Sequence, residues 1–370
     1  MNKANIGFLG AGGIARSHVF ALNSLKYFYP EPPEFNLAAV TSARAESRNS
    51  FASEFEFGSA LTVDELTSSA DIDTVFILGP NNVHFTQLKA ALSMPAVKRI
   101  YLEKPVCSNH SEEMEIGRIL SENHGDKIIQ VGFQFLMGSA IREALSWWRE
   151  KDFGRPLHFS FTLKHSDYLD ISYRNKRRTR LTDAPDGGAM ADLGSHALSL
   201  MVAFLGEGVQ IRSAIQSGSY TDVSPGSDLY SEISVYDPKS HAVGNVSSSR
   251  VSSGIGDMMA FEIFGERGTL KYNSLNPDRF DYFFEESGDW STRFTGSSYK
   301  PVTSFPSGHV PAGWLRALIH AHYVFLTGKD KLATVPDLHH GLEVQRLVRE
   351  TAEHMTLFRE DTANIRKDNL

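Results

Sequence analysis

A short apolar strand, a glycine-rich turn and the start of a helix follow one another at the N-terminus. The run Ile6-Gly7-Phe8-Leu9 ends at Gly10-Ala11-Gly12-Gly13-Ile14-Ala15, after which apolar residues recur at helical spacing. Glycines allow a tight turn and let the backbone approach a ligand, and the N-terminus of a helix attracts phosphate groups. This order predicts an α/β domain that binds a dinucleotide through Gly10, Gly12, Gly13 and Ile14.

The alternation of strand and helix continues to about residue 130. Apolar runs predict buried parallel strands at residues 73–78, 99–102 and 127–131, with helices at 83–92 and 111–120 between them. This is the pattern of a doubly wound sheet, whose ligands bind beyond the carboxyl ends of the strands. We therefore assign residues 1–130 to a dinucleotide-binding domain.

Polar residues emerge from the carboxyl ends of two of these strands. Pro80, Asn81 and His84 follow one strand, and Glu103 and Lys104 follow the next. Lys104 is placed to hydrogen-bond a substrate hydroxyl or to stabilise a developing alkoxide. The alternative is a salt bridge between Lys104 and Glu103 at the end of the strand.

The end of the second strand bears on the choice between NAD and NADP. The strand at 37–40 leads into Thr41-Ser42-Ala43-Arg44, whereas an NAD enzyme usually offers Asp or Glu to the ribose hydroxyls at this point. Hydroxyl groups and an arginine suit a 2′-phosphate, so Ser42 and Arg44 favour NADP. Alternatively, Arg44 and Arg48 are solvated residues of the next helix.

Beyond residue 133 the sequence pattern changes to long strands. Alternating apolar and polar residues predict them at 157–165, 230–236, 242–251, 259–264 and 269–272. We therefore expect a second domain at residues 131–370, an α+β domain with a large, mainly antiparallel open sheet. Helices expected at 188–205, 312–326 and 338–357 are the candidates to cover one face of this sheet. Any part of the sheet left bare favours self-association.

The helix that begins near Gly188 brings Asp192 and His196 into the second domain. The two residues are four apart, so on an α-helix they lie one turn above each other on the same face. A nearby carboxylate can fix the tautomer of a histidine and raise its basicity, which suits a general acid/base. The alternative is an ordinary hydrogen bond at the surface.

The composition excludes several classes of protein. The net charge of -7 and the absence of a long basic run argue against a nucleic-acid partner, although residues 174–180 are locally basic. The single cysteine, Cys107, excludes an internal disulfide and a cysteine-based zinc site. Without a signal peptide or an apolar stretch that could span a bilayer, we expect a cytoplasmic protein with no membrane partner.

Two pairs of neighbouring histidines raise the question of a metal. His320 and His322 are two residues apart, and His339 and His340 are adjacent. Side chains at these spacings on a helix point in different directions, so satisfied or exposed histidines are the simpler interpretation. We therefore assign no metal.

Taken together, the motifs resemble those of the Gfo/Idh/MocA family, the glucose-fructose oxidoreductase and inositol dehydrogenase group of NAD(P)-dependent sugar oxidoreductases. The resemblance covers nearly the whole chain. It rests on Gly10-Ala11-Gly12-Gly13-Ile14-Ala15, Pro80-Asn81-x-x-His84, Glu103-Lys104-Pro105, and Gly188 with Asp192-x-x-x-His196. It implies a Rossmann domain followed by a large open sheet that often forms a homodimer or homotetramer.

The resemblance also implies roles for individual residues. Lys104 and His196 would be the catalytic pair, and Asp192 would support His196 or hold substrate. Glu103 would help to shape the nicotinamide pocket, and Pro80, Asn81, His84 and Lys104 would also contact the cofactor.

Two further segments are similar to parts of the sugar pocket in pyranose and anhydrosugar dehydrogenases of the family. They are His165-Ser166-Asp167-Tyr168 and Ser307-Gly308-His309. Asp167, Tyr168 and His309 would therefore bind substrate together with Lys104, Asp192 and His196. Where many relatives carry an arginine shortly after residue 131, this chain departs from the family and reads Phe133-Gln134-Phe135-Leu136-Met137.

The sequence thus predicts an NAD(P)-dependent dehydrogenase or reductase acting on a secondary hydroxyl of a sugar, glycoside or cyclitol, with NADP favoured. Two alternatives stay open. Some relatives oxidise a glycoside transiently, eliminate the aglycone and reduce the product again, which gives glycoside cleavage with the same cofactor. The other alternative is a non-catalytic sensor of nucleotide or sugar, and the presence of both Lys104 and His196 counts against it.

Overall fold

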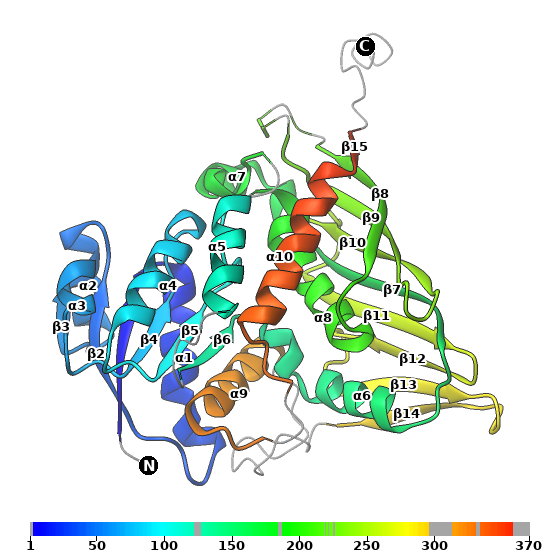
Figure 1. Cartoon of the computed structure of the whole chain (residues 1–370), viewed down its shortest axis with the longest axis horizontal. Coiled ribbons are helices and arrows are strands. Elements are labelled where there is room, and N and C mark those ends of the chain that lie inside the picture. The colour runs from blue at the N-terminus through cyan, green and yellow to red at the C-terminus, as the bar shows by residue number, and fades with distance from the viewer. Residues whose placement is uncertain are drawn as a thin grey trace.

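The computed structural model places two β-sheets side by side, with helices packed on both faces of the first and on one face of the second (Figure 1). It describes residues 3–121, 127–183, 187–218, 220, 222–224, 226–295, 313–330 and 334–357. Within these residues, no helix combines the length and apolar character that a membrane crossing requires.

The first sheet is parallel throughout its described part. Its six strands lie in the order β3-β2-β1-β4-β5-β6. They are β1 (Ala4–Leu9), β2 (Phe35–Thr41), β3 (Ser59–Leu61), β4 (Thr74–Ile77), β5 (Arg99–Leu102) and β6 (Ile128–Val131). The order reverses between β1 and β4, which is where a doubly wound sheet opens a crevice for a ligand.

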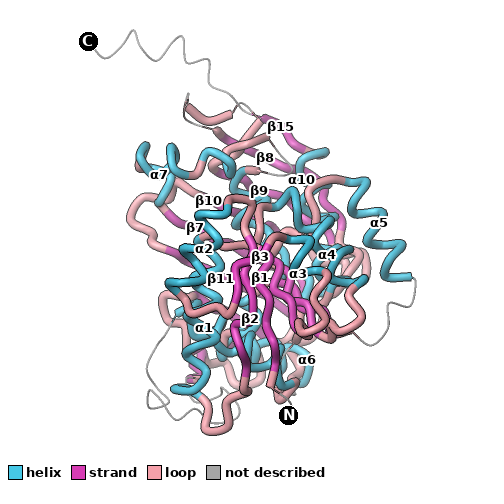
Figure 2. Tube along the Cα trace, turned by 90° about the vertical axis from the view of Figure 1, so that its left-hand side faces the viewer, coloured by secondary structure: helices cyan, strands magenta, loops and turns pink. Residues whose placement is uncertain are grey.

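Five helices near the chain's start cover the two faces of this sheet. They are α1 (Gly13–Phe28), α2 (Ala45–Glu54), α3 (Val63–Thr67), α4 (His84–Ser93) and α5 (His110–Ser121). Figure 2 shows α1 and α2 on one side of the strands and α3 and α4 on the other. The apolar positions of α1 that recur at helical spacing are buried against Phe8 and Phe76. The doubly wound domain predicted from sequence is confirmed.

The second sheet is open and mainly antiparallel. In the described chain its nine strands have the order β14-β13-β12-β11-β7-β10-β9-β8-β15. Only the pairs β7 with β10 and β8 with β15 are parallel among the strand pairs described. The strands are β7 (Pro156–His165), β8 (Gln210–Ser217), β9 (Tyr230–Tyr236), β10 (Val243–Ser249), β11 (Asp257–Gly265), β12 (Gly268–Asn273), β13 (Arg279–Phe284), β14 (Trp290–Phe294) and β15 (Met355–Leu357). This confirms the predicted fold class.

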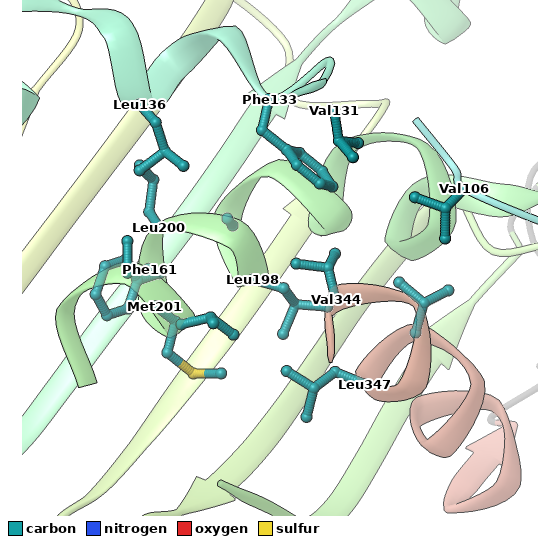
Figure 3. Packing of buried hydrophobic residues seen from close by; sticks show 14 of the residues in the cluster. Val106, Val131, Phe133, Leu136, Phe161, Leu198, Leu200, Met201, Val344 and Leu347 are labelled. Carbon is teal, nitrogen blue, oxygen red and sulfur yellow. The ribbon is translucent and has the colours of Figure 1, made fainter. Parts of the chain in front are cut away.

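Helices cover one face of the second sheet and join it to the first domain. They are α6 (Ser139–Glu150), α8 (Ser195–Leu205) and α10 (Leu338–Glu353). In Figure 3, Leu198 of α8 packs near Val344 of α10, with Val131 at the end of β6 and Phe133 just beyond it close by. One hydrophobic core therefore runs through both parts of the molecule.

The helix predicted at 312–326 packs elsewhere than expected. This helix, α9 (Gly313–Thr327), lies beside α1 and buries Leu318, Ile319 and Phe325 in the core of the first domain (Figure 1). The ring of Tyr323 on α9 stacks on Tyr29, with centroids 3.9 Å apart. The expectation that α9 covers the second sheet was wrong, because its apolar face fits the aromatic surface of the first domain. The division at residue 130 stays a prediction.

Candidate active site

The glycine turn lies at the carboxyl end of β1, at the reversal of strand order. Gly10 has a φ of +136°, and a Cβ there would lie 2.6 Å from the carbonyl carbon of Leu78, so a larger residue would be strained and would clash. A Cβ at Gly12 or Gly13 would meet no atom within 4 Å. The N-terminus of α1 is therefore open to an approaching phosphate, and the turn fits a dinucleotide.

Basic side chains gather after β2, close to Ser42. Arg44 is exposed and precedes the first turn of α2. Arg48 donates from Nη1 to the backbone oxygen of Ser42 at 3.3 Å, and its buried Nε has no partner among the described residues. Sequence reasoning had treated Arg48 only as a solvated alternative, yet it is the arginine that holds the Ser42 loop.

His84 braces the two loops that leave β4 and β5. Its Nδ1 lies 2.6 Å from the backbone oxygen of Pro105, and its Nε2 lies 2.9 Å from the backbone oxygen of Gly79. Both ring nitrogens are thus engaged by the protein. The direct polar contact between His84 and the cofactor, expected from sequence, does not fit this arrangement, whereas Asn81 of the same segment lines the cavity described below.

Glu103 points into the interior of the first domain. Its Oε1 lies 3.0 Å from Nε2 of His18, whose Nδ1 lies 2.9 Å from Nε2 of His322 on α9. A Cβ at residue 132 would lie 2.6 Å from Oε1, so Gly132 makes room for the carboxylate. Because Glu103 is directed to His18, the alternative salt bridge between Glu103 and Lys104 does not form.

Lys104 instead crosses from the first domain to the helix that carries His196. Its Nζ donates to the backbone oxygen of Asp192 at 2.7 Å and to Oδ1 of the same residue at 2.9 Å. The side chain is only 12% exposed. The cation is therefore held at a defined place between the two domains, as a group that must meet a substrate oxygen requires.

The segment Met190–Gly194 is a π-helix that continues directly into α8. Its start is held by Asp228, whose Oδ2 accepts from the backbone N–H of Met190 at 2.9 Å. Gly188 is required beside it, since it has a φ of +93° and a Cβ there would lie 1.8 Å from Oδ1 of Asp228. Burial raises the pKa of Asp228 to about 6. A π-helix widens the turn, so Asp192 and His196 are not stacked as in the predicted α-helix.

The carboxylate of Asp192 is surrounded by three cations. Oδ2 accepts from Nη2 of Arg250 at 2.9 Å, and Oδ1 accepts from Lys104 and from Nη1 of Arg180. Burial alone would raise the pKa of Asp192, but Lys104, Arg180 and Arg250 outweigh it and hold that pKa well below its usual value. Asp192 is therefore ionised, and its carboxylate binds Lys104 rather than His196.

His196 is buried between aromatic rings. Its ring meets Phe133 and Phe135 edge-on at centroid distances of 5.8 and 5.3 Å. Its Nδ1 is buried without a hydrogen-bond partner among the described residues. Burial, followed by the charge of Lys104, lowers the pKa of His196 well below its usual value, and Asp192 opposes this only in part. Asp192 thus acts in the expected direction, but burial and Lys104 outweigh it.

In the segment His165–Tyr168, the side chains of His165 and Tyr168 are buried and that of Asp167 is exposed. Tyr168 is buried, and the guanidinium of Arg250 lies 4.5 Å from the centre of its ring. Asp167 is exposed and donates its backbone N–H to Nδ1 of His165 at 3.1 Å. Tyr168 thus supports Arg250, and the predicted substrate residue His309 lies outside the described residues.

A small cavity brings residues of both domains together. It is lined by Asn81, Lys104, Pro105, Arg180, Gly187, Ala191, Asp192 and Arg250. Sequence reasoning missed the roles of Arg180 and Arg250. Arg180 belongs to the basic run at 174–180, which was the available signal, whereas nothing in the sequence distinguished Arg250 at the end of its strand. A larger open groove between α4, α5 and α10 contains none of the predicted site residues.

The paired histidines of α9 are engaged inside the protein. His320 lies 2.6 Å from the hydroxyl of Tyr29 and 2.8 Å from Oδ2 of Asp330. His322 contacts His18 as described above. Among the described residues, no group of three or more His, Cys, Asp or Glu side chains is arranged to hold a metal ion.

A parallel sheet with a glycine turn at its switch point, completed by a cationic cavity from an open-sheet domain, defines a two-domain dinucleotide-binding oxidoreductase. The chain belongs to the Gfo/Idh/MocA family. Residues 4–133 match the model of its oxidoreductases with an NAD-binding Rossmann fold, and residues 141–271 match the model of the GFO/IDH/MocA C-terminal domain.

Two similar proteins are named as sugar dehydrogenases. Glucose-6-phosphate 3-dehydrogenase of Bacillus subtilis is 26% identical over 280 residues, which cover 74% of this chain and 75% of the relative. Levoglucosan dehydrogenase of Pseudarthrobacter phenanthrenivorans is 24% identical over 306 residues, 77% of each chain.

Solved structures show the same fold. Levoglucosan dehydrogenase in complex with NADH and levoglucosan superposes with a TM-score of 0.80 at 22% identity and covers 95% of this chain and 97% of its own. An inositol dehydrogenase homologue with NAD+ from Azotobacter vinelandii gives a TM-score of 0.77 at 18% identity and covers 95% of this chain and 96% of its own.

Proposed function

We propose that the protein is an NAD(P)-dependent dehydrogenase or reductase that acts on a secondary hydroxyl, or the corresponding ketone, of a sugar, glycoside or cyclitol. One observation carries the proposal: Lys104 of the cofactor domain hydrogen-bonds Asp192 at 2.9 Å, on the helix that presents His196. The similarity of the chain to two proteins named as sugar dehydrogenases supports the same activity. When bound, the nicotinamide would accept hydride from, or donate it to, the substrate carbon.

Residues of the two domains would transfer the proton and stabilise the developing negative charge. In the oxidative direction the substrate hydroxyl loses its proton to His196 while its carbon loses hydride and becomes a carbonyl. His196 is able to accept that proton because its lowered pKa keeps it neutral. Lys104 donates a hydrogen bond to the same oxygen and stabilises the negative charge that develops there. Asp192 positions Lys104 and neutralises part of the charge around it.

The cofactor would lie along the carboxyl ends of β1, β2 and β4. Gly10, Gly12, Gly13 and Ile14 would hold the pyrophosphate, and the segment from Pro80 would lie along the nicotinamide half. We propose a preference for NADP. Ser42, Arg44 and Arg48 offer a hydroxyl and two guanidinium groups to a 2′-phosphate, and no acidic residue occurs at positions 41–44.

A screen with purified protein tests the activity. NAD+ and NADP+ are each supplied with a panel of sugars, cyclitols and glycosides, and the nicotinamide absorbance is followed. Net cofactor turnover on a secondary alcohol is the expected result. Glycoside cleavage without net turnover would favour the redox-assisted hydrolase, and binding without either reaction would favour the sensor.

We also propose a homodimer or homotetramer formed through the uncovered face of the second sheet. Large apolar side chains are exposed there, on strands paired in register across the sheet: Ile215, Val243, Trp290 and Phe294. An exposed sheet face of this kind is normally covered by another molecule. A cytoplasmic location is proposed with it, since a chain with a single cysteine, Cys107, forms no internal disulfide.

A further inference from the structure

Positive charge exceeds negative charge in the cavity between the domains. We propose that the carbohydrate substrate carries an anionic group, a phosphate or a carboxylate, and that Arg180 binds it at the mouth of this cavity. The inference rests on the proposed function and narrows its substrate class. It is carried by the charge of the described cavity lining, by the exposure of Arg180 and by the lack of a second acidic partner for Arg180 among the described residues.

The charges that line the cavity do not balance. Lys104, Arg180 and Arg250 provide three cations, whereas Asp192 provides a single carboxylate, so two positive charges are in excess. Glu103 does not reduce this excess, because its carboxylate is directed to His18. Asp228 lies behind the helix near Arg250, where its Oδ2 binds the backbone N–H of Met190. Even with Asp228 counted, one cation has no acidic counterpart in the described part of the lining.

The three cations differ in what they can offer to a ligand. Arg250 is fully buried, and its Nη1 donates to the backbone oxygen of Arg180 at 2.6 Å while its Nη2 binds Asp192. Nζ of Lys104 donates two hydrogen bonds to Asp192, one to its backbone oxygen and one to Oδ1. These two side chains are fixed parts of the cavity wall.

Arg180 alone of the three is open to solvent. Its side chain is 46% exposed, and only its Nη1 is hydrogen-bonded within the described residues. The remaining N–H groups of its guanidinium can bind two oxygens of a phosphate or carboxylate side by side. Arg250 holds the backbone oxygen of Arg180, so the residue is anchored while its guanidinium is available.

The neighbouring residues make the approach to Arg180 more positive. Arg177 and Arg178 are exposed on the same segment. Asp222 interacts electrostatically with Arg178, but its carboxylate is bound to Arg174 at 2.8 Å. A segment with an excess of positive charge raises the local concentration of anions. The cofactor pyrophosphate is a different anion, since its predicted site is the turn at 10–13 and no residue of that turn lines the cavity.

Matched sets of substrates test the proposal. Glucose, glucose 6-phosphate and glucuronate form one set, the corresponding galactose and mannose compounds form two more, and myo-inositol is paired with its monophosphate. In at least one set the anionic member should exceed the neutral member in kcat/KM by about tenfold or more, as expected for a charge-assisted bidentate contact. The phosphate and carboxylate arms show which anion is preferred. If the neutral member is preferred in every active set, the proposal is wrong.

Variants assign the preference to Arg180. Arg180→Gln should lower the ratio of anionic to neutral kcat/KM about tenfold, mainly through KM, and Arg180→Lys should restore part of it. Arg178→Gln, which removes an exposed charge two residues away that attracts anions without contacting the bound group, is the matched control and should lower the ratio much less than Arg180→Gln. A ratio unchanged in Arg180→Gln overturns the assignment. So does an equal loss of affinity for NADH, which would make Arg180 a ligand of the cofactor.

A binding measurement separates failure of this inference from failure of the proposed function. Phosphorus NMR of inorganic phosphate should show line broadening with the wild type and much less with Arg180→Gln, whether or not any sugar is turned over. Equal broadening with both proteins would remove the anion site even if dehydrogenase activity is found. Broadening specific to the wild type, without turnover of any alcohol, would support the site and reject the activity.

Discussion

His196 is the residue on which the proposed chemistry depends most directly. It is a buried imidazole with a lowered pKa and no hydrogen bond at Nδ1 within the described chain. A neutral imidazole kept from water and set between aromatic rings is suited to take a proton from a substrate hydroxyl, and much less suited to hold a permanent charge.

We therefore expect His196→Ala to lower kcat by roughly a hundredfold or more, the usual effect of losing a general acid/base. Affinity for NAD(P)H should change little, because the residue lies on the second domain. Steady-state kinetics on a confirmed substrate and a fluorescence titration of the cofactor measure the two effects. His110→Ala, on the exposed surface of α5, is the control. Near-normal turnover in His196→Ala would refute the assignment.

Lys104 and His196 should act on a single transition state. Lys104→Ala removes stabilisation of charge on the reacting oxygen and should also reduce kcat. The decrease in kcat of the double variant should be smaller than the product of the two single decreases. The reason is that removing either group already removes most of the transition-state stabilisation that the other group provides. A double-mutant cycle in kcat measures this. Strictly multiplicative effects would mean that the two residues serve separate sites.

At the scale of single residues, the sequence could place Lys104 at a strand end and His196 on a helix, because both follow from local periodicity. It could not place Arg180 and Arg250 around Asp192. Arg250 is 58 residues from Asp192 along the chain, so their contact depends on how the second sheet pairs with the helix. Local patterns carry no information about such a contact.

The π-helix shows how one element depends on distant support. Its first N–H groups are held by Asp228, which is 38 residues away, and the approach of Asp228 requires glycine at position 188. Sequence spacing could predict that a helix begins here and ends at Leu205. It could not predict the extra residue in the turn, since the carboxylate that stabilises it lies on another part of the chain.

Asp228 should make stability depend on pH. Burial raises its pKa from 3.8 to about 6, so between these values the native state binds a proton that the unfolded state has lost, and stability falls as pH rises. The full change is about 3 kcal/mol. Asp228→Asn, whose amide oxygen can still accept from Met190, should flatten this part of the profile. Urea unfolding between about pH 4 and pH 7 measures it.

Glu46→Gln, an exposed change on α2, serves as the control for that experiment and should leave the profile as in the wild type. If the difference in stability between Asp228→Asn and the wild type does not vary with pH, then Asp228 does not titrate in this range and its burial has been overestimated.

The end of β2 should decide the choice of cofactor. Ser42→Asp places a carboxylate where a 2′-phosphate would bind, so selectivity should shift toward NAD by about tenfold or more, equivalent to about 1.4 kcal/mol of repulsion. Titration of wild type and variant with both nucleotides measures the shift. Ser50→Asp, further along α2, is the control. Tighter binding of NAD+ than of NADP+ by the wild type would contradict this interpretation of Ser42, Arg44 and Arg48.

Five of the described strands were missed by sequence reasoning. β3, β8, β13 and β14 were not predicted, and the residues of β15 were assigned to the preceding helix. β3, β14 and β15 lie at the edges of their sheets, whereas β8 and β13 lie inside the second sheet. Every residue of β14 is exposed, so it lacks the alternation of buried and exposed positions that identifies a strand. The position of α9 was missed for a different reason. Its apolar face could pack against either domain, and α9 packs on the first because the aromatic surface around Tyr29 fits that face.

At the scale of the whole molecule, the uncovered face of the second sheet should bring copies of the chain together. We expect sedimentation to show a dimer or tetramer, and expect Val243→Asp combined with Ile215→Asp to weaken it, because both side chains are exposed on that face. Ile171→Asp, at an exposed apolar position at the start of α7 (Ile171–Lys176), is the control. A wild type that sediments as a monomer at all concentrations would contradict the proposal.

The hydrophobic core that runs through both domains limits how the protein can be taken apart. Val106, and Val131 on β6 of the first sheet, share one cluster with Leu198, Val344 and Leu347 from the helices that cover the second sheet. Moreover, α9 returns from the far end of the chain to complete the first domain. The first domain therefore cannot be exchanged on its own. A chimera that receives this domain from a relative must also receive α9 and a matching surface on α8 and α10. Without them, its hydrophobic core will be left incomplete where the two proteins are joined.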